Sequence, residues 1–237
     1  MALVKKDVEG AEGAVGEGML KKAAQEAYEL HLALWLGRKA MLGKDDGAER
    51  AIFDLVVDAY NMQVPLNERT SLSKMNQAYS TPMPLAWIAG RLAGSPNDVP
   101  ATILEPTAGT GMLIASMARD ENRERAVVTA NEIDPRRAAV LEWSGTAMRR
   151  TSVEVSREDA ADPAAGIYAA EYDVIVANPP FGPLDKPQSV DGYSISRIDH
   201  LISANSLQSM KDSGRGVLIV GAHADEGVLS KNERPWW

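Results

Sequence analysis

Short apolar segments alternate with helical segments in the second half of the sequence, and this alternation restricts the folds that the chain can adopt. Five segments after Pro100 are predicted to be buried strands: residues 101–105, 126–131, 152–155, 172–177 and 216–221. Three segments between them are predicted to be helices: residues 111–119, 135–149 and 198–211. Strands that alternate with helices form a parallel sheet with helices on both faces. We therefore expect an α/β fold built on a doubly wound, mostly parallel sheet.

The composition is that of a globular protein, and it excludes several kinds of site. The chain has 237 residues, of which 45% are hydrophobic and 24% charged, with a formal net charge of −8. This acidic balance excludes a protein whose whole surface is a polycation for nucleic acid. The absence of cysteine excludes disulfides, thiolate metal sites and cysteine nucleophiles. The three histidines are far apart in the sequence, so we expect no metal site.

The N-terminal part of the chain follows a different pattern. Residues 1–18 are rich in Gly, Glu and Ala and are expected to form a flexible tail, and residues 19–70 a helical N-terminal region. Helices are predicted at 19–42 and 48–60, and Pro65 then interrupts the chain. The apolar stripe of the first helix is predicted at Leu20, Ala24, Ala27, His31 and Leu34. No apolar stretch is long enough to cross a membrane and no signal peptide is visible, so we expect a cytoplasmic protein without membrane contact.

A glycine-rich turn follows the first predicted strand, at the sheet edge where doubly wound folds bind ligands. It spans residues 105–111, and Gly109 and Gly111 let the backbone approach a ligand closely. The turn is neither a Walker loop, since no Gly-Lys-Ser/Thr follows, nor the dinucleotide fingerprint with its three spaced glycines. The second strand ends at Asn131 and Glu132, where a carboxylate can bind ribose hydroxyls. Capping of the following helix is the alternative role for that carboxylate.

The third and fourth predicted strands also end in polar residues. Either Asp159 or Asp162 is in reach of an adenine amine from the end of the third strand. The fourth strand leads into Asn-Pro-Pro-Phe, in which the prolines fix the backbone and remove two N–H donors. The side-chain oxygen of Asn178 and the carbonyl of Pro179 can then accept hydrogen bonds from one planar NH2 group, while Phe181 offers a ring for stacking. A rigid strand-to-loop turn is the structural alternative.

These segments together resemble the amino-group methyltransferases that use S-adenosylmethionine, and most of all the DNA adenine-N6 methyltransferases. Four motifs carry the resemblance: residues 105–111, residues 131–132, Asp159 and residues 178–181. Upstream, residues 75–82 resemble the segment that closes over the methionine part of the cofactor, in the order found in gamma-type enzymes and type I modification subunits. The chain is also similar to the methylase domain that phage and plasmid proteins join to a strawberry-notch-like helicase. The resemblance covers about residues 70–225.

The resemblance implies that a methyl group is transferred from S-adenosylmethionine to the exocyclic N6 amine of adenine in DNA, with the base flipped out of the helix. The implied catalytic residues are Asn178, Pro179, Pro180 and Phe181. The implied cofactor-binding residues are Tyr79, Thr81, Pro82, Glu105, Pro106, Thr107, Gly109, Gly111, Glu132, Ile133, Asp159 and Asn178.

Within the cofactor set, the resemblance assigns each residue to one part of S-adenosylmethionine. The methionine carboxylate is expected to lie against Thr81, Pro82, Thr107 and Gly109. Its amine is expected to face Glu105, usually through water. Glu132 would bind the ribose hydroxyls, and Ile133 would pack on the adenine ring.

The resemblance also implies that residues 71–237 form a Rossmann-like methyltransferase domain that lacks the last two strands of that sheet. We expect either a fragment of a longer protein or a chain that completes its sheet by self-association or with a specificity or helicase partner. Arg136, Arg137, Arg149 and Arg150 are candidates for a phosphate-facing edge. The loop 183–197 is a candidate for gripping the DNA substrate or for a flexible lid.

Two other functions remain open. Asn-Pro-Pro-aromatic segments also serve the methylation of other planar amines, such as guanine N2 in ribosomal RNA or a glutamine amide in protein. A non-catalytic module that binds the cofactor or DNA is the second alternative, although the intact segment 178–181 argues against it.

Overall fold

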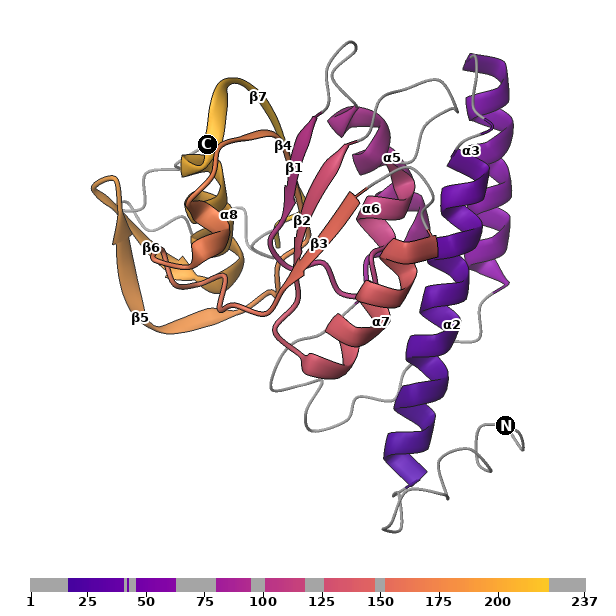
Figure 1. Ribbon diagram of the computed structural model, residues 1–237, viewed down its shortest axis with the longest axis horizontal. Helices are drawn as coiled ribbons and strands as arrows, with labels where there is room; N and C mark the ends of the chain where they lie inside the picture. Colours follow the sequence, from indigo (N-terminus) through magenta and orange to yellow (C-terminus); the bar gives the residue numbers. More distant parts are fainter. Residues whose placement is uncertain are drawn as a thin grey trace, which may run out of the picture.

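Five parallel strands form the central sheet of the computed structural model (Figure 1), which describes residues 17–40, 42, 46–62, 80–94, 101–117, 126–147 and 152–221. The strands are β1 (Thr102–Glu105), β2 (Val127–Asn131), β3 (Ser152–Ser156), β4 (Tyr172–Ala177) and β7 (Met210–Leu218). Their order across the sheet is β3-β2-β1-β4-β7, and every neighbouring pair is parallel. The predicted doubly wound parallel sheet is confirmed.

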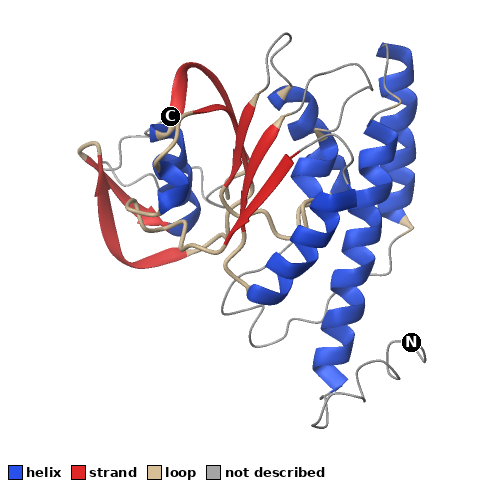
Figure 2. Cartoon of the chain, viewed as in Figure 1, coloured by secondary structure: helices blue, strands red, loops and turns tan. Residues whose placement is uncertain are grey.

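Helices cover both faces of this sheet (Figure 2). One face carries α6 (Met112–Ser116) and α7 (Pro135–Ala147), with α2 (Glu17–Ala40), α3 (Asp46–Asn61) and α5 (Met83–Ala93) packed on the same side (Figure 1). The other face carries α8 (Ile198–Gln208) and the short 3-10 helix η1 (Gly166–Tyr168). Helix α8 thus lies on the opposite face of the sheet from the N-terminal helices.

The alternation of side chains along β1 and β4 builds one core on each face of the sheet. Ile103 and Val174 belong to the core shared with α2, α5 and α6. Leu104 and Ile175 belong to the core that α8 completes through Ile202. Successive residues of a strand point to opposite faces, so both faces of these central strands are buried.

The N-terminal helices share the first of these cores, although not through the stripe predicted for α2. Leu32 and Leu36 of α2 and Val56 of α3 are buried there. Ala27 and His31 are exposed, so the predicted stripe is wrong. The positions that include Leu32 and Leu36 also follow helical spacing, and these leucine side chains occupy the core instead. No helix in the described part of the chain, α2 included, is long and apolar enough to cross a membrane.

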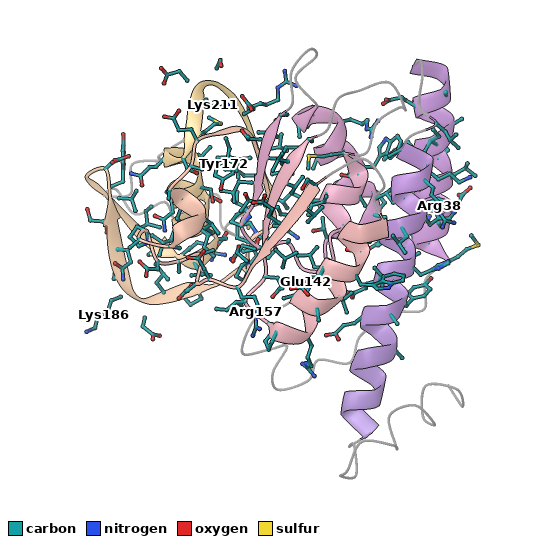
Figure 3. All side chains as sticks on the ribbon, viewed as in Figure 1. Arg38, Glu142, Arg157, Tyr172, Lys186 and Lys211 are labelled. Carbon is teal, nitrogen blue, oxygen red and sulfur yellow. The ribbon has the colours of Figure 1, made fainter. Side chains whose placement is uncertain are left out.

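The segment predicted as a loop between the Asn-Pro-Pro-Phe motif and α8 is instead an antiparallel hairpin. Its strands are β5 (Pro183–Val190) and β6 (Tyr193–Arg197). Asp191 and Gly192 connect them with φ angles of 50° and 82°, as a two-residue turn of type I′ requires. Lys186 points away from the rest of the molecule (Figure 3).

The region around β7 also differs from the prediction. Helix α8 ends at Gln208 rather than 211, and β7 begins at Met210 rather than 216. Met210 pairs with Tyr172, but Arg215 pairs with Val174, so the strand contains an irregular excursion between the two pairs. Regular pairing starts at Arg215, close to the start of the predicted strand.

The contact between α5 and α6 leaves no room for a side chain at Gly90. A Cβ atom there would lie 2.7 Å from the backbone carbonyl carbon of Ser116, which is fully buried. We expect Gly90→Ala to lower the free energy of unfolding by about 3 kcal/mol, because the helices would have to move apart. At Gly37 of α2 the nearest atom to such a Cβ lies 3.6 Å away, so Gly37→Ala should be neutral or stabilising by up to about 1 kcal/mol. Urea denaturation measures the free energy of unfolding of both variants. Equal changes in the two variants would contradict the close contact of α5 with α6 at Gly90.

Candidate active site

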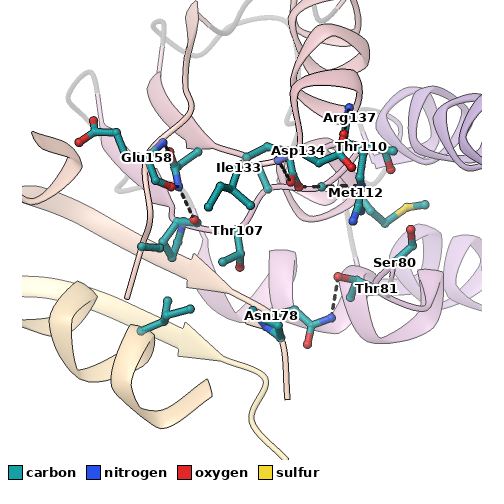
Figure 4. Close-up of a pocket in the computed structure, with 18 of the residues that line it drawn as sticks. Ser80, Thr81, Thr107, Thr110, Met112, Ile133, Asp134, Arg137, Glu158 and Asn178 are labelled. Carbon is teal, nitrogen blue, oxygen red and sulfur yellow. Dashed lines mark hydrogen bonds and ion pairs between the residues drawn. The ribbon is translucent and has the colours of Figure 1, made fainter. Parts of the chain in front are cut away.

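A cavity of about 210 Å³ opens at the carboxyl end of the sheet, where the loops after β1, β2, β3 and β4 meet (Figure 4). Nine of the predicted site residues line it: Thr81, Pro106, Thr107, Gly109, Glu132, Ile133, Asp159, Asn178 and Pro180. The parallel arrangement of the strands brings eight of these residues together, since each of the eight follows a strand at the same edge of the sheet, whereas Thr81 comes from the segment before α5.

The glycine turn after β1 adopts the backbone conformation for which glycine is suited. Gly109 and Gly111 have φ angles of 59° and 85°. The N–H of Ala108 donates to the carbonyl of Asn131 at 2.7 Å, which fixes the turn against the end of β2. At Gly109 a second constraint applies, because a Cβ atom would lie 2.5 Å from Nη2 of Arg137. The turn therefore forms one wall of the cavity with its backbone.

Asn131 holds three of these loops together. Its side-chain nitrogen donates to the carbonyls of Pro106 at 3.0 Å and Glu158 at 2.9 Å. Its side-chain oxygen accepts from the hydroxyl of Ser156 at 2.9 Å and from the N–H of Glu158 at 2.8 Å. All four bonding positions of the buried amide are thus used within the protein. Asn131 supports the cavity rather than offering a free group to a ligand.

Glu132 lies buried in the cavity beside a buried arginine. Its Oε1 accepts from the N–H of Asp134 at 2.9 Å, and its Oε2 lies 3.8 Å from Nε of Arg137. Arg137 therefore does not belong to a phosphate-facing edge: it is 6% exposed and lines the cavity. Its place on the first turn of α7 directs the long side chain back toward the glycine turn.

Glu105 lies beneath the glycine turn and does not line the cavity. Burial raises the pKa of its carboxyl group well above the ordinary value of 4.5, and the neighbouring charge of Glu132 raises it further. A hydrogen bond from the backbone of Ile114 and the charge of Arg137 act in the opposite direction. Two buried carboxylates and one buried guanidinium thus form one cluster, in which Glu132 and Arg137 line the cavity and Glu105 lies beneath them.

The raised pKa of Glu105 predicts a pH dependence of stability. The folded state holds the proton more tightly than the unfolded state, so this stabilisation is complete below pH 4.5 and is lost as the pH rises through the folded-state pKa. Glu105→Gln should remove this loss, so its free energy of unfolding should rise relative to that of the wild type as the pH increases above 4.5.

Urea denaturation at several pH values measures this difference. The matched control is Glu154→Gln, which removes an exposed acid from β3. A difference between wild type and Glu105→Gln that stays constant with pH would contradict the described burial of the carboxyl group.

The loop after β3 supplies two acids to the cavity, Glu158 and Asp159. Of the two aspartates predicted there, Asp159 lines the cavity and Asp162 does not. One carboxylate oxygen of Asp159 accepts from the N–H of Ala161 at 2.9 Å, which orients the side chain. Glu158, which the sequence reasoning missed, lines the cavity beside Asp159, and its carboxylate accepts from the N–H of Gly166.

Asn178 follows β4 and lies at the opposite end of the cavity from the acids of β3. Its side-chain nitrogen donates to the hydroxyl of Thr81 at 3.0 Å (Figure 4). Its side-chain oxygen is buried and has no hydrogen-bond partner among the described residues. The acceptor end of this amide therefore has unused hydrogen-bonding capacity at a residue that lines the cavity.

The remaining predicted residues lie next to the cavity without lining it. Pro82 precedes α5 and Gly111 precedes α6 as the N-cap residues of these helices, while Pro179 and Phe181 flank Pro180 in the chain. Tyr79, Arg149 and Arg150 lie outside the described residues. The sequence did not reveal several other lining residues: Ser80 before α5, Thr110 in the glycine turn, and Met112, Arg137, Ile198 and Ile202 on helices.

Unsatisfied polar atoms around the cavity indicate the chemistry of a fitting ligand. Within the described ranges, Oε2 of Glu105, Oγ1 of Thr107, Oγ1 of Thr110 and Oδ1 of Asn178 are buried without a hydrogen-bond partner. Buried polar atoms normally have partners, so a ligand with several donors fits this set. Apolar contacts are available from Ile133, Ile198 and Ile202. The described residues contain no group of three His, Cys, Asp or Glu side chains that could hold a metal ion.

Comparison with known proteins gives similarity at the level of solved structures. No protein-family model matches the chain, and no curated protein matches it at a significant level. TrmN from Thermus thermophilus aligns with a TM-score of 0.46 and 23% identity over 73% of this chain and 47% of that chain. The methyltransferase subunit of a type I restriction-modification system from Streptococcus thermophilus aligns with a TM-score of 0.41 and 12% identity over 57% of this chain and 33% of that chain.

An S-adenosylmethionine-dependent methyltransferase from Agrobacterium tumefaciens aligns with a TM-score of 0.38 and 15% identity over 57% of this chain and 43% of that chain. The chain spans less than half of the length of each of these three proteins. At such values the likeness concerns the fold and assigns no activity to this chain.

Proposed function

We propose that the chain binds S-adenosylmethionine in this cavity and transfers its methyl group to a planar exocyclic amine. The observation that carries the proposal is the Asn178 amide, whose buried oxygen is unpartnered in the described structure and lies at one end of the cavity that Gly109 and Glu132 line. The order of the motifs along the chain and the resemblance that they carry support the same assignment.

The residues in and beneath the cavity fit the groups that this cofactor offers. Glu132 would accept hydrogen bonds from the ribose hydroxyls, and Ile133 would pack on the adenine ring, whose amine Asp159 would bind. At the methionine end, Thr107 and the backbone of Gly109 would lie against the carboxylate. Glu105 would face the ammonium group from beneath the turn, consistent with its unpaired Oε2. A bound ammonium group would also favour the ionised form of that carboxyl.

The chemistry that the chain itself supplies is the positioning of an amine. Bound in the cavity, S-adenosylmethionine would provide an already activated methyl group. Oδ1 of Asn178 and the carbonyl of Pro179 would accept the two hydrogens of the substrate NH2, which orients its lone pair. As the nitrogen becomes positive during attack, the same two oxygens would stabilise the developing charge. The prolines contribute no N–H donor that would compete, and Phe181 would stack on the substrate ring.

The amine proposed is N6 of adenine in DNA, with the base flipped out to reach the site. This part rests on the resemblance of residues 75–82 and of the Asn-Pro-Pro-Phe segment to DNA adenine-N6 methyltransferases. DNA is therefore the proposed macromolecular partner. We further propose a specificity or helicase subunit, or a second copy of the chain, as a protein partner, because target selection in such systems requires surface beyond the catalytic core.

Transfer of a trideuterated methyl group from labelled S-adenosylmethionine tests the proposal. The purified chain is incubated with mixed-sequence DNA, with total RNA and with bacterial protein, and the digested products are analysed by mass spectrometry. The proposal predicts labelled N6-methyldeoxyadenosine from DNA. Labelled N2-methylguanosine or methylglutamine would overturn the adenine assignment while retaining amine methylation. No label in any product, with folded protein and saturating cofactor, would contradict an enzyme that acts alone.

A further inference from the structure

Thr81 contacts the catalytic motif rather than only bordering the cavity. Its hydroxyl accepts the hydrogen bond from Nδ2 of Asn178 at 3.0 Å, across 97 residues of sequence. Figure 4 shows the two side chains next to each other, joined by this bond at one end of the cavity. Both side chains are partly buried, so water competes little for the interaction.

The direction of this bond determines what Asn178 offers to a substrate. A carboxamide has a donor end and an acceptor end, and only its oxygen can accept a hydrogen from an amine. With Nδ2 bonded to Thr81, Oδ1 remains buried without a partner among the described residues. A rotation of the amide by 180° would present two N–H donors to the substrate amine, and these would repel it. The hydroxyl of Thr81 anchors the amide, and the substrate amine favours the orientation in which this hydroxyl accepts from Nδ2.

We propose that Thr81 is a positioning residue that holds the Asn178 amide with its oxygen toward the substrate amine. The inference rests on the proposed function, in which Oδ1 of Asn178 accepts the hydrogen of the amine. It replaces the role that the family resemblance implies for Thr81, a contact to the methionine carboxylate of the cofactor.

The surroundings of Thr81 suit a positioning role. The preceding hydroxyl, of Ser80, donates to the buried Glu29 of α2. The following residue, Pro82, is the N-cap of α5, and its carbonyl accepts from the N–H of Ala86 at 2.9 Å. The chain is thus fixed on both sides of Thr81, and its β-branched side chain has few rotamers. A fixed hydroxyl can orient a neighbouring amide without a large entropic cost.

Variants of Thr81 separate the positioning role from the cofactor role. Thr81→Val keeps the shape but removes the hydroxyl, and should lower kcat about 50-fold while the Kd for S-adenosylmethionine stays within about two-fold. Thr81→Ser retains the hydroxyl and should recover kcat to within about five-fold of the wild type. A Thr81→Val variant with weakened cofactor binding and unchanged kcat at saturating cofactor would overturn the inference in favour of the cofactor role.

A measurement without turnover keeps the inference testable if the proposed function fails. The side-chain NH2 signal of Asn178, assigned by its loss in Asn178→Ala, is followed by NMR hydrogen exchange in the protein without substrate. Thr81→Val should increase its exchange rate at least about ten-fold. The control is Ser144→Ala, which removes a buried hydroxyl that bonds only within α7 at 2.8 Å and should leave that rate unchanged. An unchanged exchange rate in Thr81→Val would overturn the inference whatever the substrate proves to be.

Discussion

Asn178→Ala is expected to reduce kcat for methyl transfer by about 1,000-fold while leaving the affinity for S-adenosylmethionine within a few-fold of the wild type. The reason is that Oδ1 of Asn178, unpartnered among the described residues, is the acceptor proposed to hold the substrate amine. The groups proposed for the cofactor belong to other loops, those after β1, β2 and β3, and the substitution leaves them in place.

Single-turnover transfer from radiolabelled S-adenosylmethionine measures the rate, and isothermal titration measures the affinity. Asn205→Ala is the matched control, since it truncates a buried asparagine of α8 that does not line the cavity. A variant that loses cofactor binding together with transfer would show that the cavity is not divided into a cofactor end and a reactive end.

Asn131→Ala is expected to lower the free energy of unfolding by about 4 kcal/mol. Four hydrogen bonds end on this amide, and the substitution would leave buried backbone groups of Pro106 and Glu158 without partners. The loops after β1 and β3 would also lose their common support, so cofactor affinity should fall with stability.

Urea denaturation checks this expectation against Ser156→Ala, which removes only one of the four bonds and should cost about 1 kcal/mol. If the two variants were destabilised equally, Asn131 would not be the common support of the loops that the structure describes.

The sheet could be predicted from the sequence because buried parallel strands leave a simple signal. The central strands β1 and β4 are short apolar runs, and four predicted strands fall within two residues of the observed bounds. The hairpin that follows the Asn-Pro-Pro-Phe motif was missed because β5 is mostly exposed and polar. The signal that could have revealed it is the Asp191-Gly192 pair, a dipeptide that favours a type I′ turn.

The candidate site likewise contains residues that the sequence reveals and residues that only the folded structure reveals. Residues such as Gly109, Glu132 and Asn178 were found because they follow strands, and parallel strands end at one edge of the sheet. Arg137 was assigned to the surface because only the packed structure shows its side chain folding back onto the glycine turn. Ile198 and Ile202 line the cavity from α8, and no local pattern separates them from ordinary core residues.

The central claim is that one cavity holds S-adenosylmethionine with its reactive end at Asn178. A crystal structure of the chain with S-adenosylhomocysteine, which differs from the cofactor only by the transferred methyl group and the positive charge on sulfur, tests it most directly. The account predicts ribose hydroxyls bonded to Glu132 and the sulfur atom facing Oδ1 of Asn178. Density for the ligand outside this cavity, or in it with the adenine ring against Asn178, would contradict the account.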